Sequence, residues 1–546
     1  MTLSISSDTY KKITSILYYS IVCLFFVAVG LNIIYQIKYV LGTNVHMPFM
    51  EPDNYEYYLF AQMAIAHPAL TQYNITNPYL IGAAPGFFEH AGLYLMPVYL
   101  YNLLHLPIVW EFRILQILAT FIIYLISLLI TKKVLDSLPV HKVYHWLAYT
   151  IIITSFLLMQ YTSIIEWRGN EFISAIGLLS IYVLAWIYTK KSSLIILSWI
   201  PMYVLAVLAM WIWSGGIIII PLIIALFIGF IIYSIILRSH NKIWKYIAFL
   251  IVIGAIILFL FTAQIDYILN SLVIHLGIVG INCAYNPLHI GEIECLNTSN
   301  GLLAILMMIV FASFALVAFL GNTIMSNNKK DYEYYLVGVL IAGFLMLPLA
   351  LIYIRLLSLI APYFTIMYAL GIVAMLSYFG KTGSNKLILF LTIIMILISS
   401  FIGQYLFYLS NITLYSLANP AGLVNATEYM SSIQPNASVL TYFGYGGYIE
   451  AYGHLHVYTD TVQGLNYTKI SQIDRVFGQN MSKDCQILKA IQPTPYFLMV
   501  SNNMLNSSLF INASNNSILK NPNSFNNLCD YELVYNQRGF IIFKNK

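Results

Sequence analysis

The chain has 546 residues, of which 60% are hydrophobic and only 9% are charged, and its mean hydropathy is +0.79. Soluble globular proteins carry about 25% charged residues, so this composition excludes an ordinary soluble protein and indicates a polytopic α-helical membrane protein. The formal net charge of +5 does not indicate a nucleic-acid partner, because the lysines form short clusters between apolar runs.

The apolar runs predict about eleven to thirteen membrane spans, since one span needs about 20 apolar residues. Eleven runs are visible, and two short or re-entrant pieces can lie within the longer ones. The first run is too long for a signal peptide and has no small-residue cleavage site, so we expect a retained span. The runs lie at 14–40, 112–131, 143–163, 172–189, 193–211, 215–237, 244–265, 301–322, 334–350, 353–378 and 386–409.

Clusters of lysine and arginine between these runs predict the orientation of the chain. They fall on one side of the predicted spans, and the positive-inside rule assigns that side to the cytoplasm. The outer side then holds loops 41–111 and 266–300 and a short turn at 164–171. We therefore expect a transmembrane unit over residues 1–409 and a small extracytoplasmic α/β domain over 410–546.

The three outer segments that precede this domain each supply carboxylates. Converging carboxylates repel one another unless a cation or a proton lies between them, and oxygen ligands of this kind suit Mg²⁺ or Mn²⁺. Taken singly, each acid is equally consistent with a solvated loop residue. The first loop also contains the apolar stretch AGLYLMPVYLYNLLHL, which is expected to lie along the membrane interface. The acids are Glu51, Asp53 and Glu56 in the first segment, Glu166 and Glu171 in the second, and Glu292 and Glu294 in the third.

One arginine stands almost alone in a late apolar run, LIYIRLLSLIAPYFTIMYALGI. A charge inside a span is costly and marks a candidate functional site, and an arginine can hold a phosphate or diphosphate through two hydrogen bonds. The alternative is that Arg355 lies at the outer edge of the span and extends its side chain to the surface.

Cysteines and glycosylation sequons agree with this topology. Cys283 pairs with Cys295 in one outer loop, and Cys485 with Cys529 in the C-terminal domain, if the outer face is oxidising; free thiols are the alternative. All the Asn-x-Ser/Thr sequons map to the predicted outer side. They begin at Asn74, Asn297, Asn411, Asn425, Asn436, Asn466, Asn480, Asn506, Asn512 and Asn515.

The first segment of the C-terminal domain that attracts attention is TYFGYGGYIEAYGHLHVYTD, residues 441–460. It is rich in aromatic residues and glycine and has no obvious catalytic group. Considered alone, it is consistent with an ordinary strand and turn of a small α/β domain.

In their order along the chain, these motifs resemble the catalytic subunit of the AglB-type single-subunit oligosaccharyltransferases of archaea and bacteria, which are GT-C glycosyltransferases. The resemblance covers essentially the whole chain. It implies that Asp53 in PDNYEYY and Glu171 in RGNEF bind a Mn²⁺ or Mg²⁺ ion, and that Glu292 or Glu294 is the glutamate of the long outer loop. It further implies that Arg355 binds the donor phosphate.

The segment TYFGYGGYI resembles the family's Trp-Trp-Asp-Tyr-Gly motif, which holds the hydroxyl of the acceptor sequon. Tyr442 and Phe443 stand where the family has tryptophans, and Tyr445 and Gly446 match. Gly444 replaces the aspartate that would bind the hydroxyl.

A second departure lies in the acidic motif, where Gly169 replaces a metal ligand, so Glu166 or Glu171 would have to substitute. The resemblance implies transfer of an oligosaccharide from a polyprenyl (dolichyl) phosphate or diphosphate to the asparagine of a sequon. The implied partners are the lipid-linked oligosaccharide, an acceptor polypeptide and membrane lipid, for a chain that can act as a monomer. The two departures leave three alternatives open: transfer to another acceptor, a weakened paralogue that only binds the lipid-linked glycan, and a transporter with an outer cap.

Overall fold

The structure is a computed structural model of the 546-residue chain. It describes the following residues: 52–68, 76–82, 91–136, 145–146, 148–149, 151–153, 169–189, 199–212, 219, 222–223, 226–228, 230, 334–343, 362–363, 365–373, 420–459, 475–502, 504 and 513–546.

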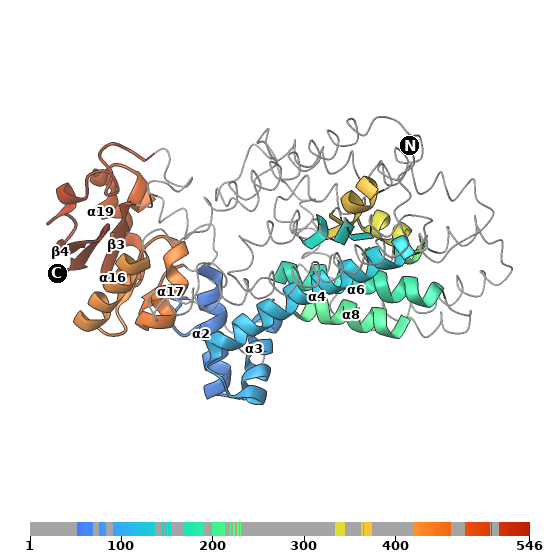
Figure 1. The fold of residues 1–546 in the computed structure, drawn as a ribbon. Helices are drawn as coiled ribbons and strands as arrows, with labels where there is room; N and C mark the ends of the chain where they lie inside the picture. The colour runs from blue at the N-terminus through green and yellow to red at the C-terminus, as the bar shows by residue number, and fades with distance from the viewer. Residues whose placement is uncertain are drawn as a thin grey trace, which may run out of the picture.

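The N-terminal part is helical. Helix α2 packs on α3, α3 packs on both α4 and α8, and α6 lies between α4 and α8 (Figure 1). The approach of α3 to α8 depends on a glycine, because a Cβ at Gly92 would lie 2.4 Å from the Cα of Ile212. The helices are α2 (Pro52–Ala66), α3 (Ala91–Leu104), α4 (Ile108–Asp136), α6 (Gly169–Tyr188) and α8 (Trp199–Ile212).

Helix α4 has its polar side chains inside and apolar side chains outside. Of the helices in the described ranges, it is the one that is long and apolar enough to cross a membrane, judged by length and composition. Leu118 and Leu125, seven residues apart on one face, are 46% and 40% exposed. The opposite face is buried and carries Arg113, Gln116, Thr120, Ser127 and Thr131. This polarity is the reverse of that of a soluble amphipathic helix and is typical of a helix that meets lipid outside and other helices inside.

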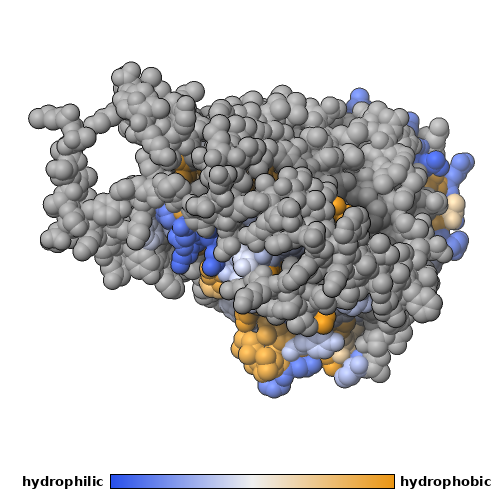
Figure 2. Space-filling model, turned by 90° about the vertical axis from the view of Figure 1, so that its right-hand side faces the viewer, coloured by the Kyte–Doolittle hydropathy of each residue, from blue (hydrophilic) through white to orange (hydrophobic). Residues whose placement is uncertain are grey.

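Other apolar helices also carry exposed apolar side chains. On α8, Ile200 and Val204 are 63% and 55% exposed, and at the end of α3, Leu103 is 74% exposed. Figure 2 shows described hydrophobic residues gathered along the lower edge of the molecule, where Figure 1 draws α3 and α8. Surfaces of this kind are rare on soluble monomers and mark a contact with lipid or another protein.

The C-terminal part is a mixed α/β unit around a five-stranded sheet with the order β2-β1-β3-β5-β4. Strands β2, β1 and β3 run parallel, and β5 and β4 are added antiparallel. Strand β3 is buried along its whole length and forms the centre of the core. The elements are α16 (Pro420–Ile433), β1 (Ser438–Leu440), α17 (Phe443–Gly453), β2 (His456–Val457), α19 (Met481–Ala490), β3 (Phe497–Ser501), the short η6 (Pro522–Phe525), β4 (Tyr531–Gln537) and β5 (Phe540–Asn545).

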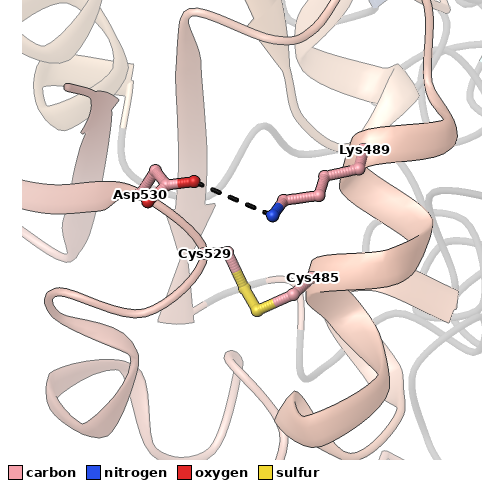
Figure 3. Close-up of a disulfide and its surroundings, with 4 residues drawn as sticks. All are labelled: Cys485, Lys489, Cys529 and Asp530. Atoms are coloured by element: carbon pink, nitrogen blue, oxygen red, sulfur yellow. Dashed lines mark ion pairs between the residues drawn. A yellow bond between two sulfur atoms is a disulfide. The ribbon is translucent and has the colours of Figure 1, made fainter.

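A disulfide between Cys485 and Cys529 joins α19 to the turn before β4 (Figure 3). Beside it, Lys489 and Asp530 form an exposed ion pair at 4.0 Å. This is one of the two cysteine pairs that the sequence predicts. The other, Cys283 with Cys295, lies outside the described residues.

The helical part and the α/β unit meet at two places. Helix α2 packs against α17 (Figure 1). In addition, Leu80 from the loop after α2 forms a parallel bridge to Val457 of β2. The backbone N–H of Ile81 donates to the carbonyl of Val457, and the N–H of Val457 donates to the carbonyl of Tyr79, both at 2.8 Å. The predicted first outer loop therefore extends the sheet of the C-terminal part by one short strand.

Candidate functional site

Residues 441–460 do not fold as a strand and turn but carry an eleven-residue helix, α17, between two parallel strands. Glycine inside a helix costs roughly 1 kcal/mol relative to alanine, and α17 includes Gly444, Gly446, Gly447 and Gly453. Burial on both faces offsets this cost, because α17 lies between α2 and the sheet unit. His454 ends the helix in the left-handed conformation, and its N–H donates to the carbonyls of Glu450 and Ile449.

Four tyrosines form the contact between α2 and α17. Tyr448 and Tyr452 stack with ring centroids 5.1 Å apart, and Tyr452 stacks on Tyr58 at 5.7 Å. Tyr55 meets Tyr448 and Tyr452 edge-on, at 5.1 and 5.8 Å. Such aromatic pairs contribute about 0.5–1.5 kcal/mol each beyond the burial of their surface. We call Tyr55, Tyr58, Tyr448 and Tyr452 the tyrosine cluster.

Burial raises the pKa of the outer two members of this stack, Tyr58 and Tyr452, and a hydrogen bond joins their hydroxyls. Burial likewise raises the pKa of Tyr448, with a smaller contribution from the negative charge of Glu428. These rings therefore stay neutral at physiological pH and act through packing rather than through charge.

Buried polar side chains flank the cluster. Asn54 and Glu56 on α2 and Glu450 on α17 are 0% exposed. Neither amide atom of Asn54 has a hydrogen-bond partner among the described residues. A buried polar group left without a partner costs about 1–3 kcal/mol, so Asn54 is suited to bind a polar ligand or water at the start of α2.

Two of the predicted metal ligands lie at helix N-termini. Asp53 is the second residue of α2, which begins with Pro52, and Glu171 is the third residue of α6, which begins with Gly169. Proline suits the first position of a helix, and a carboxylate in the first turn is stabilised by the helix dipole. Helix α4 contacts both α2 and α6.

Other predicted site residues, Glu166, Glu292, Glu294 and Arg355, lie outside the described residues, as does Asp460 of the aromatic segment. Within the part of the chain that the structure describes, there is no group of three or more His, Cys, Asp or Glu side chains able to hold a metal ion. The donor chemistry of Asp53 and Glu171 nevertheless suits Mg²⁺ or Mn²⁺, which prefer carboxylate oxygens.

The predicted acceptor-binding segment occupies the first turn of α17, and its members have different environments. Tyr442 precedes the helix and is half-buried, Phe443 is the first helical residue, and Gly446 is buried. Tyr445 is 4% exposed and meets Phe540 of β5 edge-on at 5.5 Å. Burial raises the pKa of Tyr445 to about 12, although a hydrogen bond with Ser501 acts in the opposite direction.

Gly444 lies directly under the ring of Tyr442. A Cβ at this position would lie 2.6 Å from Cε1 of Tyr442. Tyr445 is thus part of the domain core, and Tyr442 is the residue of this segment that is described as partly accessible.

The loop contact beside α17 was not anticipated from the sequence. Tyr79 lies with its ring 5.4 Å from His454 and 5.8 Å from His456. A turn precedes it, in which Asn77 accepts a hydrogen bond from the N–H of Tyr79 at 3.0 Å. The Asn-Pro pair at 77–78 is a turn signal that could have located this segment, but no local pattern reveals its partner strand.

Comparison with known proteins gives similarity at the level of structure. No protein-family model matches the sequence, and no curated protein matches it. Three solved structures of the Archaeoglobus fulgidus oligosaccharyltransferase resemble the chain over nearly its whole length. One holds an inhibitory peptide and a dolichol-phosphate, and it has a TM-score of 0.60 at 12% identity, with 97% of this chain and 74% of that chain covered.

The second structure carries a tethered acceptor peptide with the NVT sequon, and its TM-score is 0.59 at 12% identity, over 97% of this chain and 74% of that chain. The third is a complex with Zn and sulfate, and its TM-score is 0.60 at 13% identity, over 96% and 73% of the two chains. The chain therefore has the fold of the GT-C membrane glycosyltransferases.

Proposed function

We propose that the chain is a membrane-embedded glycosyltransferase that moves an oligosaccharide from a polyprenyl phosphate or diphosphate to the asparagine of an Asn-x-Ser/Thr sequon. The observation that carries this proposal is the contact of α2 with α17, which brings the helix that begins at Asp53 beside the segment Tyr442–Gly446. The two motifs are almost 400 residues apart in the sequence, and the proposed reaction needs them at one centre.

In the proposed centre, Asp53, Glu171 and the loop glutamate, Glu292 or Glu294, hold the divalent ion, with Glu166 as the substitute ligand where Gly169 has removed one. The ion supplies a Lewis acid that offsets the negative charge developing on the departing phosphate. Arg355 binds the same phosphate through its guanidinium group. Asp53 and the loop glutamate orient the acceptor amide and accept its proton.

The membrane arrangement is part of the same proposal. We infer an orientation in which the C-terminal α/β unit and the α2–α3 loop lie outside, and in which Lys132 and Lys133 near the end of α4 lie inside. The reversed polarity of α4 and the exposed apolar side chains of α3 and α8 support insertion in a bilayer.

A second candidate is transfer to an acceptor other than a sequon, and Gly444 is the observation that favours it. The family motif has an aspartate at this place, whereas here the Tyr442 ring covers the position and Tyr445 is buried in the core. A hydroxyl-binding aspartate contributes on the order of 1–3 kcal/mol when it is buried, so its loss weakens sequon recognition before it weakens donor binding.

The test compares three variants in one transfer assay with lipid-linked oligosaccharide and Mn²⁺. Asp53→Ala and Arg355→Ala should abolish transfer at an unchanged melting temperature, whereas Leu103→Ala, at an exposed position of α3, should not change it. Mn²⁺ should raise the melting temperature of the wild type but not that of Asp53→Ala. Transfer to a hydroxyl acceptor with none to a sequon peptide would favour the second candidate, and indifference to Asp53→Ala and Arg355→Ala would refute both.

A further inference from the structure

The chain carries glycosylation sequons of its own, and four of them begin within the described residues, at Asn425, Asn436, Asn480 and Asn515. All four lie in the C-terminal α/β unit. Their environments differ enough to separate a position that can carry a glycan in the folded chain from positions that the fold has already engaged.

Three of the four asparagines bind neighbouring side chains. With its amide in the orientation that the surrounding donors favour, Asn425 accepts from Nη1 and Nε of Arg538 at 2.6 and 3.2 Å. Asn480 accepts from the amide of Asn516 at 3.1 Å. Asn515 accepts from Nζ of Lys520 at 3.3 Å.

Asn436 is different because its side chain is exposed and makes no hydrogen bond to the described residues. It lies in the turn between α16 and β1, and its φ of 61° places it in the left-handed region. Asparagine tolerates this conformation better than most residues, and it is found there mainly in turns. A glycan on this side chain would point into solvent and displace nothing.

The hydroxyl of the same sequon, by contrast, is engaged by the fold. Ser438 is the first residue of β1, and its Oγ donates to the carbonyl of Thr494 at 3.3 Å and accepts from the N–H of Tyr496 at 2.9 Å. An enzyme that reads the hydroxyl of a sequon needs these bonds to be absent. The sequon is therefore readable only before β1 joins β3.

We propose that Asn436 is a site of N-linked glycosylation, and that the glycan is attached before the C-terminal sheet forms. The inference rests on the proposed function, which supplies the reaction. A bond forms between Nδ2 of Asn436 and the anomeric carbon of the glycan, while the bond from that carbon to the carrier phosphate breaks and its electron pair leaves with the phosphate. One amide proton passes to a carboxylate base of the transferase.

The site is tested by glycopeptide mapping of the full chain taken from its native membrane. The peptide that contains Asn436 should be mass-shifted, and the shift should be absent from Asn436→Gln and from Ser438→Ala. Ser438→Thr, which keeps the sequon, should retain it. Asn515→Gln serves as the control because Ser517, the hydroxyl residue of that sequon, is 0% exposed, and it should leave the shift at Asn436 unchanged. An unmodified Asn436 in the wild type would overturn the assignment.

The timing is tested with unglycosylated full chain from a host without the pathway. The folded chain should not be modified at Asn436 when it is added as acceptor to the transferase and lipid-linked oligosaccharide, whereas a synthetic peptide of residues 430–442 should be. Equal modification of folded chain and peptide would overturn the timing. If an unrelated sequon peptide is also unmodified, the proposed function fails, and the mass of Asn436 in the native protein still decides the assignment.

Discussion

Tyr442 and Gly444 limit the room for a ligand at the first turn of α17. A Cβ at position 444 meets the Tyr442 ring at 2.6 Å, so even the smallest side chain has to displace that ring. From the sequence, Gly444→Asp is expected to restore the acceptor for a sequon hydroxyl. In the structure the same change first has to move Tyr442.

Gly444→Ala should therefore lower the free energy of unfolding by about 1–3 kcal/mol, the usual cost of overpacking. Tyr442→Ala combined with Gly444→Ala should cost less than the sum of the two single changes, because the small residue at 442 removes the clash. Denaturant unfolding of the four proteins in a double-mutant cycle measures this coupling. Strict additivity would show that the Tyr442 ring moves away freely.

Tyr445 makes stability depend on pH in the alkaline range. Its pKa is raised from 10.0 to about 12 by burial, so the folded state disfavours the tyrosinate. The stabilisation is present in full below pH 10 and is lost as the pH rises through 12, and it amounts to roughly 2–3 kcal/mol by linkage. Tyr445→Phe should reduce the fall in unfolding free energy between pH 9 and pH 12. An unchanged pH profile would mean that other buried tyrosines carry it.

At the scale of elements, the contact between α2 and α17 joins the two halves of the proposed centre. The tyrosine cluster begins two residues after Asp53 and ends in the last turn of α17. The strand contact of Leu80 with Val457 fixes the same loop at a second point. Displacing α2 should therefore disturb the proposed centre without touching a reacting group.

Tyr55→Ala should destabilise the chain by about 3–5 kcal/mol, as truncation of a fully buried aromatic does, since Tyr55 is 0% exposed. It should also lower kcat for transfer and speed hydrogen exchange at the amides of α2. Tyr55→Phe keeps the ring contacts and should restore kcat. Tyr99→Ala is the control, because Tyr99 is 60% exposed. Normal exchange in Tyr55→Ala would show that α2 does not depend on α17.

The disulfide stabilises the attachment of α19 to the sheet. It links residues 44 positions apart, and a crosslink of this span contributes on the order of 3–4 kcal/mol through the unfolded state. Cys485→Ser with Cys529→Ser should lower the melting temperature accordingly in calorimetry, and reductant should have the same effect on the wild type. Lys489→Ala should have almost no effect, because the ion pair to Asp530 is about three-quarters exposed. Equal effects of the two changes would contradict this account.

On the scale of the whole molecule, the sequence predicts what depends on local pattern. The apolar runs at 112–131 and 172–189 correspond to the helices α4 and α6, and AGLYLMPVYLYNLLHL contains α3. A cysteine pair with suitable spacing predicts the Cys485–Cys529 disulfide.

Long-range pairing could not be predicted in the same way. Nothing near Tyr55 indicates that its partners are Tyr448 and Tyr452, since a contact over almost 400 residues leaves no local trace. The spacing of Tyr445, Tyr448 and Tyr452 is helical, but the glycines between them favour a turn, and tertiary burial outweighs that preference.

Orientation of the whole chain is a separate prediction. In sealed right-side-out vesicles, added protease should remove the C-terminal α/β unit, and a membrane-impermeant amine reagent should not label Lys132, which is exposed near the end of α4. Labelling in opened vesicles is the control. The reverse pattern would contradict both the topology and the proposed function.

Mass spectrometry of an acceptor peptide tests the central claim most directly. The purified wild-type chain is incubated with lipid-linked oligosaccharide, Mn²⁺ and a peptide that contains Asn-x-Thr, and in parallel with the same peptide carrying glutamine in place of asparagine. We expect the mass of the intact glycan on the asparagine peptide, none on the glutamine peptide, and none on either with Asp53→Ala. An unmodified asparagine peptide, with donor that a known oligosaccharyltransferase consumes in the same membrane preparation, would contradict the claim.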